Sequence, residues 1–347
     1  MKARIVILSA LVAASIAAGM GYAATPQTHL AGTLAFTGEP PVGRSQIFLA
    51  RPDGTIKQLT HAQYSLSALS WSPDGSRLLV FEFHPPTDTE VSVLNADGSW
   101  NATVSAHVDN RPHWSPDGKR IAFQRRRAIY VVRDDGSLHR VGHPELRLAG
   151  NGAPSTLGGG LSWAPDGTRI AYVGTQKGRP ALFVVPTDGS APPTAIYAPK
   201  SGGSLYDEPE WSTDGTQIAF TAPGGIYVVK PDGTGLKRLR AGRYFGAVWS
   251  PRSLLIAFVG AHANYLMTRD GTHMKRLPGC VCTNVYPGFE QRLSWSSDGG
   301  EIAYSGGVGP HADGGIYYVD IDGSGATRVA YSSNFAYYGP IWRPGGH

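Results

Sequence analysis

A five-residue block that recurs along the 347-residue chain constrains its fold more than any other feature. In its fullest form the block reads Trp-Ser-Pro-Asp-Gly, and its copies are spaced 38 to 49 residues apart. Self-similarity at a period of about 45 residues is typical of repeat architectures, in which each unit buries its apolar face against the next. Seven of the eight tryptophans begin such a block: Trp71, Trp114, Trp163, Trp211, Trp249, Trp295 and Trp342.

Each repeat has the pattern of four short β-strands. The block is followed by an apolar run such as RIAF or QIAF, and then by a second aromatic and β-branched run such as IYVV. An Asp-Gly pair ends this second run, a turn in which glycine supplies a positive φ and aspartate caps its own backbone. Four strands per unit, repeated about an axis, predict the blades of a β-propeller. The chain's 45 glycines and 26 prolines disfavour a helical bundle. The second turns begin at Asp53, Asp97, Asp135, Asp188, Asp232, Asp270 and Asp322.

The two ends of the chain predict how the ring closes. Residues 33–36 read TLAF with no preceding block, and the chain ends on PIWRPGG, a first strand with nothing after it. Pairing of Ile341 and Trp342 with residues 34–36 would complete a seventh blade and remove two open sheet edges. We therefore predict an all-β fold in which residues 25–347 form a single seven-bladed β-propeller domain, with six blades as the alternative.

Residues 1–24 have the pattern of a secretory signal peptide. Lys2 and Arg4 precede an apolar run from Ile5 to Met20, and small residues follow. We expect this segment to be cleaved and the remaining chain to be exported, periplasmic or secreted, as a monomer without a membrane span; an uncleaved anchor is the alternative. Apart from residues 125–127, which we assign to a hairpin tip, basic residues are scattered, so nucleic acid is not expected as a partner.

The WSPDG repeats resemble those of the TolB-type periplasmic propellers. The resemblance covers nearly all of residues 25–347 and implies the propeller architecture. TolB itself has an additional N-terminal α/β domain and six blades, whereas this sequence predicts seven blades and leaves no room for that domain. The resemblance therefore does not imply a role in the Tol–Pal envelope system, since a fold does not determine function.

Ionisable residues gather on one face of the first strands. This face contains the residues one and three positions before the repeat tryptophan, and first strands line the central channel of a propeller, so these side chains should converge at its mouth. A self-neutralising network of charges between blades is the alternative. The residues are Arg111, His113, Glu208, Glu210 and Arg292. The loops 197–210, 277–292 and 330–340, which we assign to the same end, add Tyr206, Asp207, Tyr286, Tyr337 and Tyr338 as ligand-binding candidates.

Three further patterns are typical of metal or disulfide sites. Cys280 and Cys282 are the only cysteines and, in an exported chain, are expected to form a disulfide, with a thiolate metal site as the alternative. Residues 320–325 match the first half of a calcium loop, but Tyr331 replaces its bidentate glutamate, so turn capping is expected there. The histidines His84, His262 and His311 are expected in exposed hairpin loops. No metal ligand or cofactor is predicted.

Two functions are compatible with these features. No GxSxG elbow and no glycine-rich phosphate loop occurs, so the leading hypothesis is a non-catalytic propeller that binds a protein or a cell-envelope glycan. The alternative is a metal-assisted lyase of acidic polysaccharide, because some propellers that resemble this one are such lyases. Arg111, Arg292, His113 and Tyr286 would then neutralise a uronate and remove its proton. Glu208 and Glu210 argue against an anionic substrate at the same place.

Overall fold

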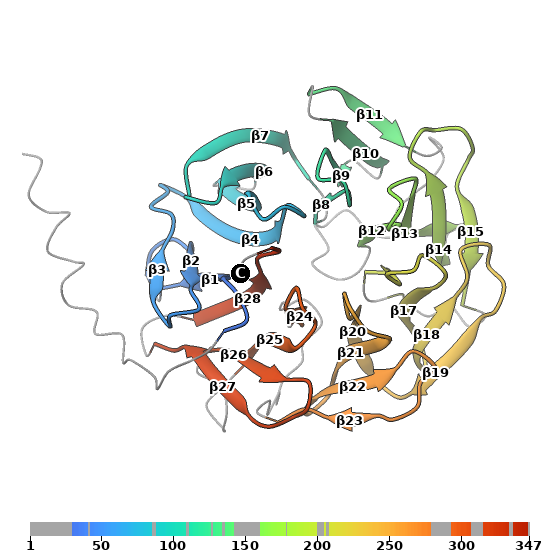
Figure 1. Cartoon of the computed structure of the whole chain (residues 1–347). Coiled ribbons are helices and arrows are strands. Elements are labelled where there is room, and N and C mark those ends of the chain that lie inside the picture. The colour runs from blue at the N-terminus through green and yellow to red at the C-terminus, as the bar shows by residue number, and fades with distance from the viewer. Residues whose placement is uncertain are drawn as a thin grey trace, which may run out of the picture.

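The described part of the protein contains twenty-eight strands, and the first strand of each blade lies beside a central axis (Figure 1). The computed structural model describes residues 30–345 except 41, 85–87, 109–110, 126–127, 134–135, 142–159, 178, 200–204, 206–207, 279–292, 307–314 and 333–335. The strands of this described part make seven four-stranded antiparallel sheets, and it contains no helix. The predicted all-β, seven-bladed propeller is confirmed, and the six-bladed alternative is excluded.

The blades follow one another along the chain. Blade I contains β28 (Ala336–Trp342), β1 (Leu34–Glu39), β2 (Gln46–Ala50) and β3 (Ile56–Gln58). Blade II contains β4 (Ser65–Trp71), β5 (Arg77–His84), β6 (Asp88–Asn95) and β7 (Trp100–Ala106). Blade III contains β8 (His113–Trp114), β9 (Arg120–Arg125), β10 (Ala128–Arg133) and β11 (Leu138–Val141). Blade IV contains β12 (Leu161–Trp163), β13 (Arg169–Gln176), β14 (Arg179–Pro186) and β15 (Thr194–Tyr197).

Blades V to VII repeat the same order. Blade V contains β16 (Glu210–Trp211), β17 (Ile218–Ala222), β18 (Gly225–Val229) and β19 (Lys237–Ala241). Blade VI contains β20 (Tyr244–Trp249), β21 (Leu255–Gly260), β22 (Asn264–Thr268) and β23 (Lys275–Arg276). Blade VII contains β24 (Ser294–Trp295), β25 (Glu301–Gly306), β26 (Gly315–Asp320) and β27 (Ala326–Ala330). The first strand of each blade lies nearest the axis and the fourth lies at the periphery (Figure 1).

The ring closes through the last strand of the chain. β28 pairs antiparallel with β1, with Trp342 opposite Leu34 and Ile341 opposite Ala35, as predicted. A register shift between Ala35 and Thr37 interrupts the ladder. Blade I therefore combines the two ends of the described chain. As a result, every second strand is paired on both sides, and every first strand is paired on one side and faces the channel on the other.

One rim residue was placed wrongly from the sequence. β28 already begins at Ala336, so the segment assigned to a rim loop is largely a strand. Tyr337 is only 2% exposed, and its ring packs edge-on against Phe36 and Phe48 at 5.3 and 5.8 Å between centroids. Its position opposite the glycine Gly38 leaves room for the ring inside the blade. Tyr337 is therefore a core residue and not a rim residue available to a ligand.

The WSPDG block forms a tight turn between the first and second strands. In blade II the Ser72 hydroxyl donates to Asp74 Oδ1 at 2.5 Å, and the Gly75 amide donates to the Ser72 carbonyl at 2.8 Å. Hydrogen bonds from Ser72 and Ser76 hold the pKa of Asp74 down at about 2. The block at Trp249 lacks both Asp and Gly, and there the Ser250 hydroxyl takes the place of the carboxylate by accepting from Ser253 Oγ at 2.8 Å.

The second Asp-Gly turns have the predicted capping geometry. In each of the six that the structure describes, the aspartate carboxylate accepts a hydrogen bond from the amide two residues later, for example Thr55 to Asp53 at 2.9 Å. The calcium-like turn follows the same rule, with the Ser324 amide 2.7 Å from Asp322 Oδ1. The Lys275 ammonium group also donates to the Asp322 carbonyl. The carboxylates of this turn therefore serve as caps.

Candidate functional site

A pocket opens at one end of the central channel. Its volume is about 250 Å³. Four blades contribute the residue immediately before the repeat tryptophan, because alternation along the first strand turns that position toward the axis. These residues are Ser70, His113, Ser162 and Glu210. The walls are completed by Trp71, Pro73, Trp114, Ser115, Pro116 and Trp163.

The pocket lies at the WSPDG end of the channel. Pro73, Ser115 and Pro116 belong to the turns that follow the tryptophans, so the pocket is formed where the first strands end. The loops that join one blade to the next enter where the first strands begin, for example before Ser65. The sequence predicts that the ionisable residues lie at the same end as these loops. Where the structure describes such a connection, as before Ser65, the pocket lies at the opposite end of the first strand.

His113 and Glu208 form an ion pair although they come from blades III and V. His113 Nε2 lies 3.3 Å from Glu208 Oε2, and the two side chains are 21% and 10% exposed. Glu208 belongs to the segment before β16 in blade V, and His113 belongs to β8 in blade III. Between them lies blade IV, where the residue three positions before the tryptophan is Gly160. A Cβ atom at Gly160 would collide with the Glu208 side chain, so the glycine allows the carboxylate to reach His113.

Tryptophan indole groups from neighbouring blades donate hydrogen bonds to backbone carbonyls of the pocket residues. Trp163 Nε1 donates to the His113 carbonyl at 3.0 Å, and Trp249 Nε1 donates to the Glu210 carbonyl at 3.1 Å. Each hydrogen bond joins the channel strand of one blade to the repeat tryptophan of the next. The positions of His113 and Glu210 are thus determined by the packing between blades, which is rigid compared with a surface loop.

The sequence-predicted residues fall into three groups. His113, Glu208 and Glu210 are brought to the channel, whereas Arg111 is half-buried just before β8 and does not line the pocket. Tyr338 is half-buried in β28. The following candidates lie outside the described residues, as do the proposed signal segment and His311: Tyr206, Asp207, Cys280, Cys282, Tyr286 and Arg292.

Sequence reasoning missed three small residues of this site. Ser70 and Ser162 line the pocket, and Gly160 lies under Glu208. All three occupy the positions one or three residues before a repeat tryptophan, the same positions that contain the ionisable candidates. The sequence therefore predicts that these positions face the channel. It does not single out these residues, because neither serine nor glycine has an ionisable side chain.

The fold and the axial pocket together define a class: a seven-bladed β-propeller with a candidate binding site at one end of its channel. No family model matches the sequence. A TolB homolog from Chlorobium luteolum is 30% identical over 138 residues, which are 38% of this chain and 29% of that protein. This chain thus spans less than a third of the length of that curated relative.

Solved structures agree with this assignment at the level of the fold. TolB from Acinetobacter baumannii matches 91% of this chain and 68% of its own, with a TM-score of 0.56 and 15% identity. An oligogalacturonate lyase from Vibrio parahaemolyticus matches 87% of this chain and 86% of its own, with a TM-score of 0.59 and 12% identity. The chain is a seven-bladed β-propeller whose fold is similar to that of TolB. Within the described residues, no helix has the length and apolar character needed to cross a membrane.

Proposed function

We propose that the protein is an exported, non-catalytic β-propeller that binds a protein or a cell-envelope glycan at the mouth of its channel. The observation that carries this proposal is the pocket in which four blades place one side chain each around a common axis. Convergence of residues from distant positions in the sequence is typical of binding sites. The signal-like residues 1–24 support export.

The lining of the pocket favours a protein segment over a sugar chain. A volume of about 250 Å³ accommodates one side chain or one sugar unit. The tryptophans Trp71, Trp114 and Trp163 are each less than a tenth exposed, and an arginine guanidinium group lies over each ring, so little aromatic surface is open for a sugar ring to stack on. The carboxylate of Glu210, with the hydroxyls of Ser70 and Ser162, suits a basic or amide-bearing side chain that enters along the axis.

The test is a pull-down from envelope extracts with the wild-type protein and a Glu208→Ala, Glu210→Ala double variant. We expect the partner of the wild type to be lost by the double variant, whose fold is checked by circular dichroism. Glu39→Ala, an exposed glutamate of blade I, is the matched control and should retain the partner. Protease treatment of the extract distinguishes a protein partner from a glycan. A partner retained by the double variant would exclude the channel as its binding site.

Lyase activity is the second candidate, and the pairing of His113 with Glu208 is the observation that favours it. A carboxylate beside an imidazole can orient it as a proton acceptor, the base that β-elimination requires. Glu210 in the same pocket would repel a uronate carboxylate. Incubation with polyuronates, with and without Mn²⁺ or Ca²⁺, tests this candidate through the absorbance of unsaturated products. An increase that His113→Ala abolishes would establish it, and no increase would exclude it.

A further inference from the structure

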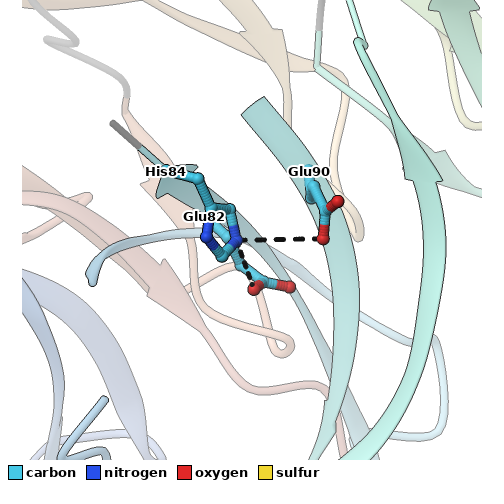
Figure 2. A group of neighbouring side chains, drawn as sticks. All are labelled: Glu82, His84 and Glu90. Carbon is cyan, nitrogen blue, oxygen red and sulfur yellow. Dashed lines mark hydrogen bonds and ion pairs between the residues drawn. The ribbon is translucent and has the colours of Figure 1, made fainter. Parts of the chain in front are cut away.

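Two glutamates and a histidine form a cluster at the β5–β6 end of blade II, away from the channel (Figure 2). Glu82 and His84 are two residues apart on β5, and Glu90 on β6 lies directly opposite Glu82 in the ladder. Side chains two apart on a strand and directly opposite across a ladder project from the same face. Leu78 and Val80, on the same face of β5, pack against blade I. The cluster therefore lies on the face of blade II that looks toward blade I.

The three side chains point their ligand atoms toward one another. His84 Nε2 lies 3.1 Å from Glu82 Oε2 and 3.8 Å from Glu90 Oε2. One ligand atom from each residue falls within 4.8 Å of the other two. Figure 2 shows the imidazole nitrogen facing both carboxylates. Bonds of about 2.0–2.2 Å to a common ion place neighbouring ligand atoms about 3–3.5 Å apart, so the spacing needs little adjustment.

The described residues do not balance the charges of this cluster. Glu82 is only 2% exposed, and its Oε1 atom has no hydrogen-bond partner in the described part of the chain. Among the residues that the structure describes, no lysine or arginine lies within ion-pair distance of Glu82. Two carboxylates directly opposite on one face repel each other, and a buried carboxylate without compensation is costly. A divalent cation carries the two positive charges that would balance both carboxylates.

Tyr64 holds the histidine in place. Its ring lies 4.3 Å from the imidazole of His84 between centroids, just before β4. The imidazole is thus packed from one side and directed at the carboxylates on the other.

We propose that Glu82, His84 and Glu90 bind a divalent transition-metal ion. One imidazole nitrogen with two carboxylate oxygens is a donor set suited to Zn²⁺ or Mn²⁺, whereas Ca²⁺ prefers oxygen ligands only. Three protein ligands leave further positions for water. The ion would link β5 to β6 beside the interface with blade I, and it would be independent of the channel pocket.

The experiment measures Zn²⁺ binding by titration calorimetry on the metal-stripped protein, purified without an affinity tag. A Cys280→Ser, Cys282→Ser background removes the thiolates as competing ligands. In this background we expect one Zn²⁺ per chain and a rise in Tm on binding. His84→Ala and Glu90→Gln should each weaken binding at least about tenfold, since loss of even an outer partner of a metal costs about 10–100-fold. His262→Ala, an exposed hairpin histidine, is the matched control and should bind normally.

Two further measurements keep the outcome clear. Co²⁺ in place of Zn²⁺ should give visible absorption bands that disappear in His84→Ala. Thermal unfolding of each metal-free variant establishes that it is folded, and both altered side chains are about one-third exposed, so little packing is lost. The proposal is overturned if the Cys-free protein binds no Zn²⁺, or if His84→Ala and Glu90→Gln bind it as the wild type does.

Discussion

Glu301 is a buried carboxyl group of blade VII that contacts the segment before blade I. It is 8% exposed, and its Oε2 atom accepts a hydrogen bond from the Ala31 amide at 3.1 Å. Burial, the largest effect, raises the pKa of this carboxyl to about 7, and the charges of Asp320 and Asp298 add to it. At the residue scale, this side chain should make the stability of the protein depend on pH near neutrality.

Glu301→Gln should remove that dependence. Because the carboxyl pKa is higher in the folded state than in the unfolded state, the unfolded chain loses its proton first as pH rises, and stability falls between about pH 4.5 and 7. The cost is complete above pH 7 and amounts to about 1–3 kcal/mol. Urea unfolding at pH 5 and pH 8 should therefore show that the free energy of unfolding of the variant, relative to that of the wild type, is higher at pH 8 than at pH 5. Glu39→Gln, at an exposed position, should show no such gain, and an equal difference at both pH values would contradict the prediction.

Arginines that follow the WSPDG turn join neighbouring blades. Arg77 donates to the Gly118 carbonyl of the next blade at 2.8 Å, and its guanidinium group lies 4.6 Å from the centre of the Trp114 ring. Arg120 makes the same two contacts with Gly167 and Trp163 at 3.0 and 4.8 Å. Arg343, which lies inside the last block and not after it, makes corresponding contacts with Gly75 and Trp71 across the closure of the ring. At the element scale, the tryptophan is therefore covered by a cation as well as packed against apolar side chains.

Arg77→Ala should destabilise the protein by about 1–2 kcal/mol, through loss of the cation–π contact and of one hydrogen bond to a backbone carbonyl. Arg77→Lys should lose less, because it keeps the charge but not the planar group. Guanidinium chloride unfolding measures both. Arg51→Ala, an exposed arginine of blade I, should remain within about 0.5 kcal/mol of the wild type. Equal effects of Arg77→Ala and Arg51→Ala would show that the contact between blades contributes nothing.

The closed ring is the property of the whole molecule on which the pocket depends. β28 fills the innermost position of blade I and supplies Tyr337 and Trp342 to one hydrophobic cluster with residues of β1 and of blade VII. Without it, β1 would have an open edge toward the channel and blade VII would lose its neighbour. The seven channel strands would then no longer be held at one distance from the axis.

Trp342→Ala should lower the free energy of unfolding by about 3–5 kcal/mol, the cost of a large cavity in a core. Trp100→Ala, the one tryptophan outside the repeat and 44% exposed, is the matched control and should cost far less. Truncation before Pro340 should have a larger effect and cause self-association through the open edge of β1. Thermal unfolding and light scattering measure these outcomes. A truncated chain with unchanged Tm would refute closure through β28.

Part of the candidate site could be predicted from the sequence, and part depends on the packing of the blades. Alternation about the repeat tryptophan predicted that His113 and Glu210 face the channel, because the side-chain period of a strand is a local rule. It could not predict that Glu208 crosses Gly160 to reach His113, since this contact depends on the positions of three blades. Glu82 and His84 are two residues apart in the sequence, so a strand places them on one face. That Glu90 lies opposite Glu82 depends on the register of the hairpin.

By itself, the sequence determined the number of blades, the turns within them and the strand that closes the ring. The number of blades and their turns follow from the repeat period and from Asp-Gly turn chemistry, which act over a few residues and recur in the repeats. The closing strand follows from the incomplete repeats at the two ends. Tertiary structure alone decided which end of the channel holds the pocket, that Tyr337 is buried, and which charged groups meet. Those contacts join residues far apart in the chain, so they depend on how whole blades pack, and no local pattern records that.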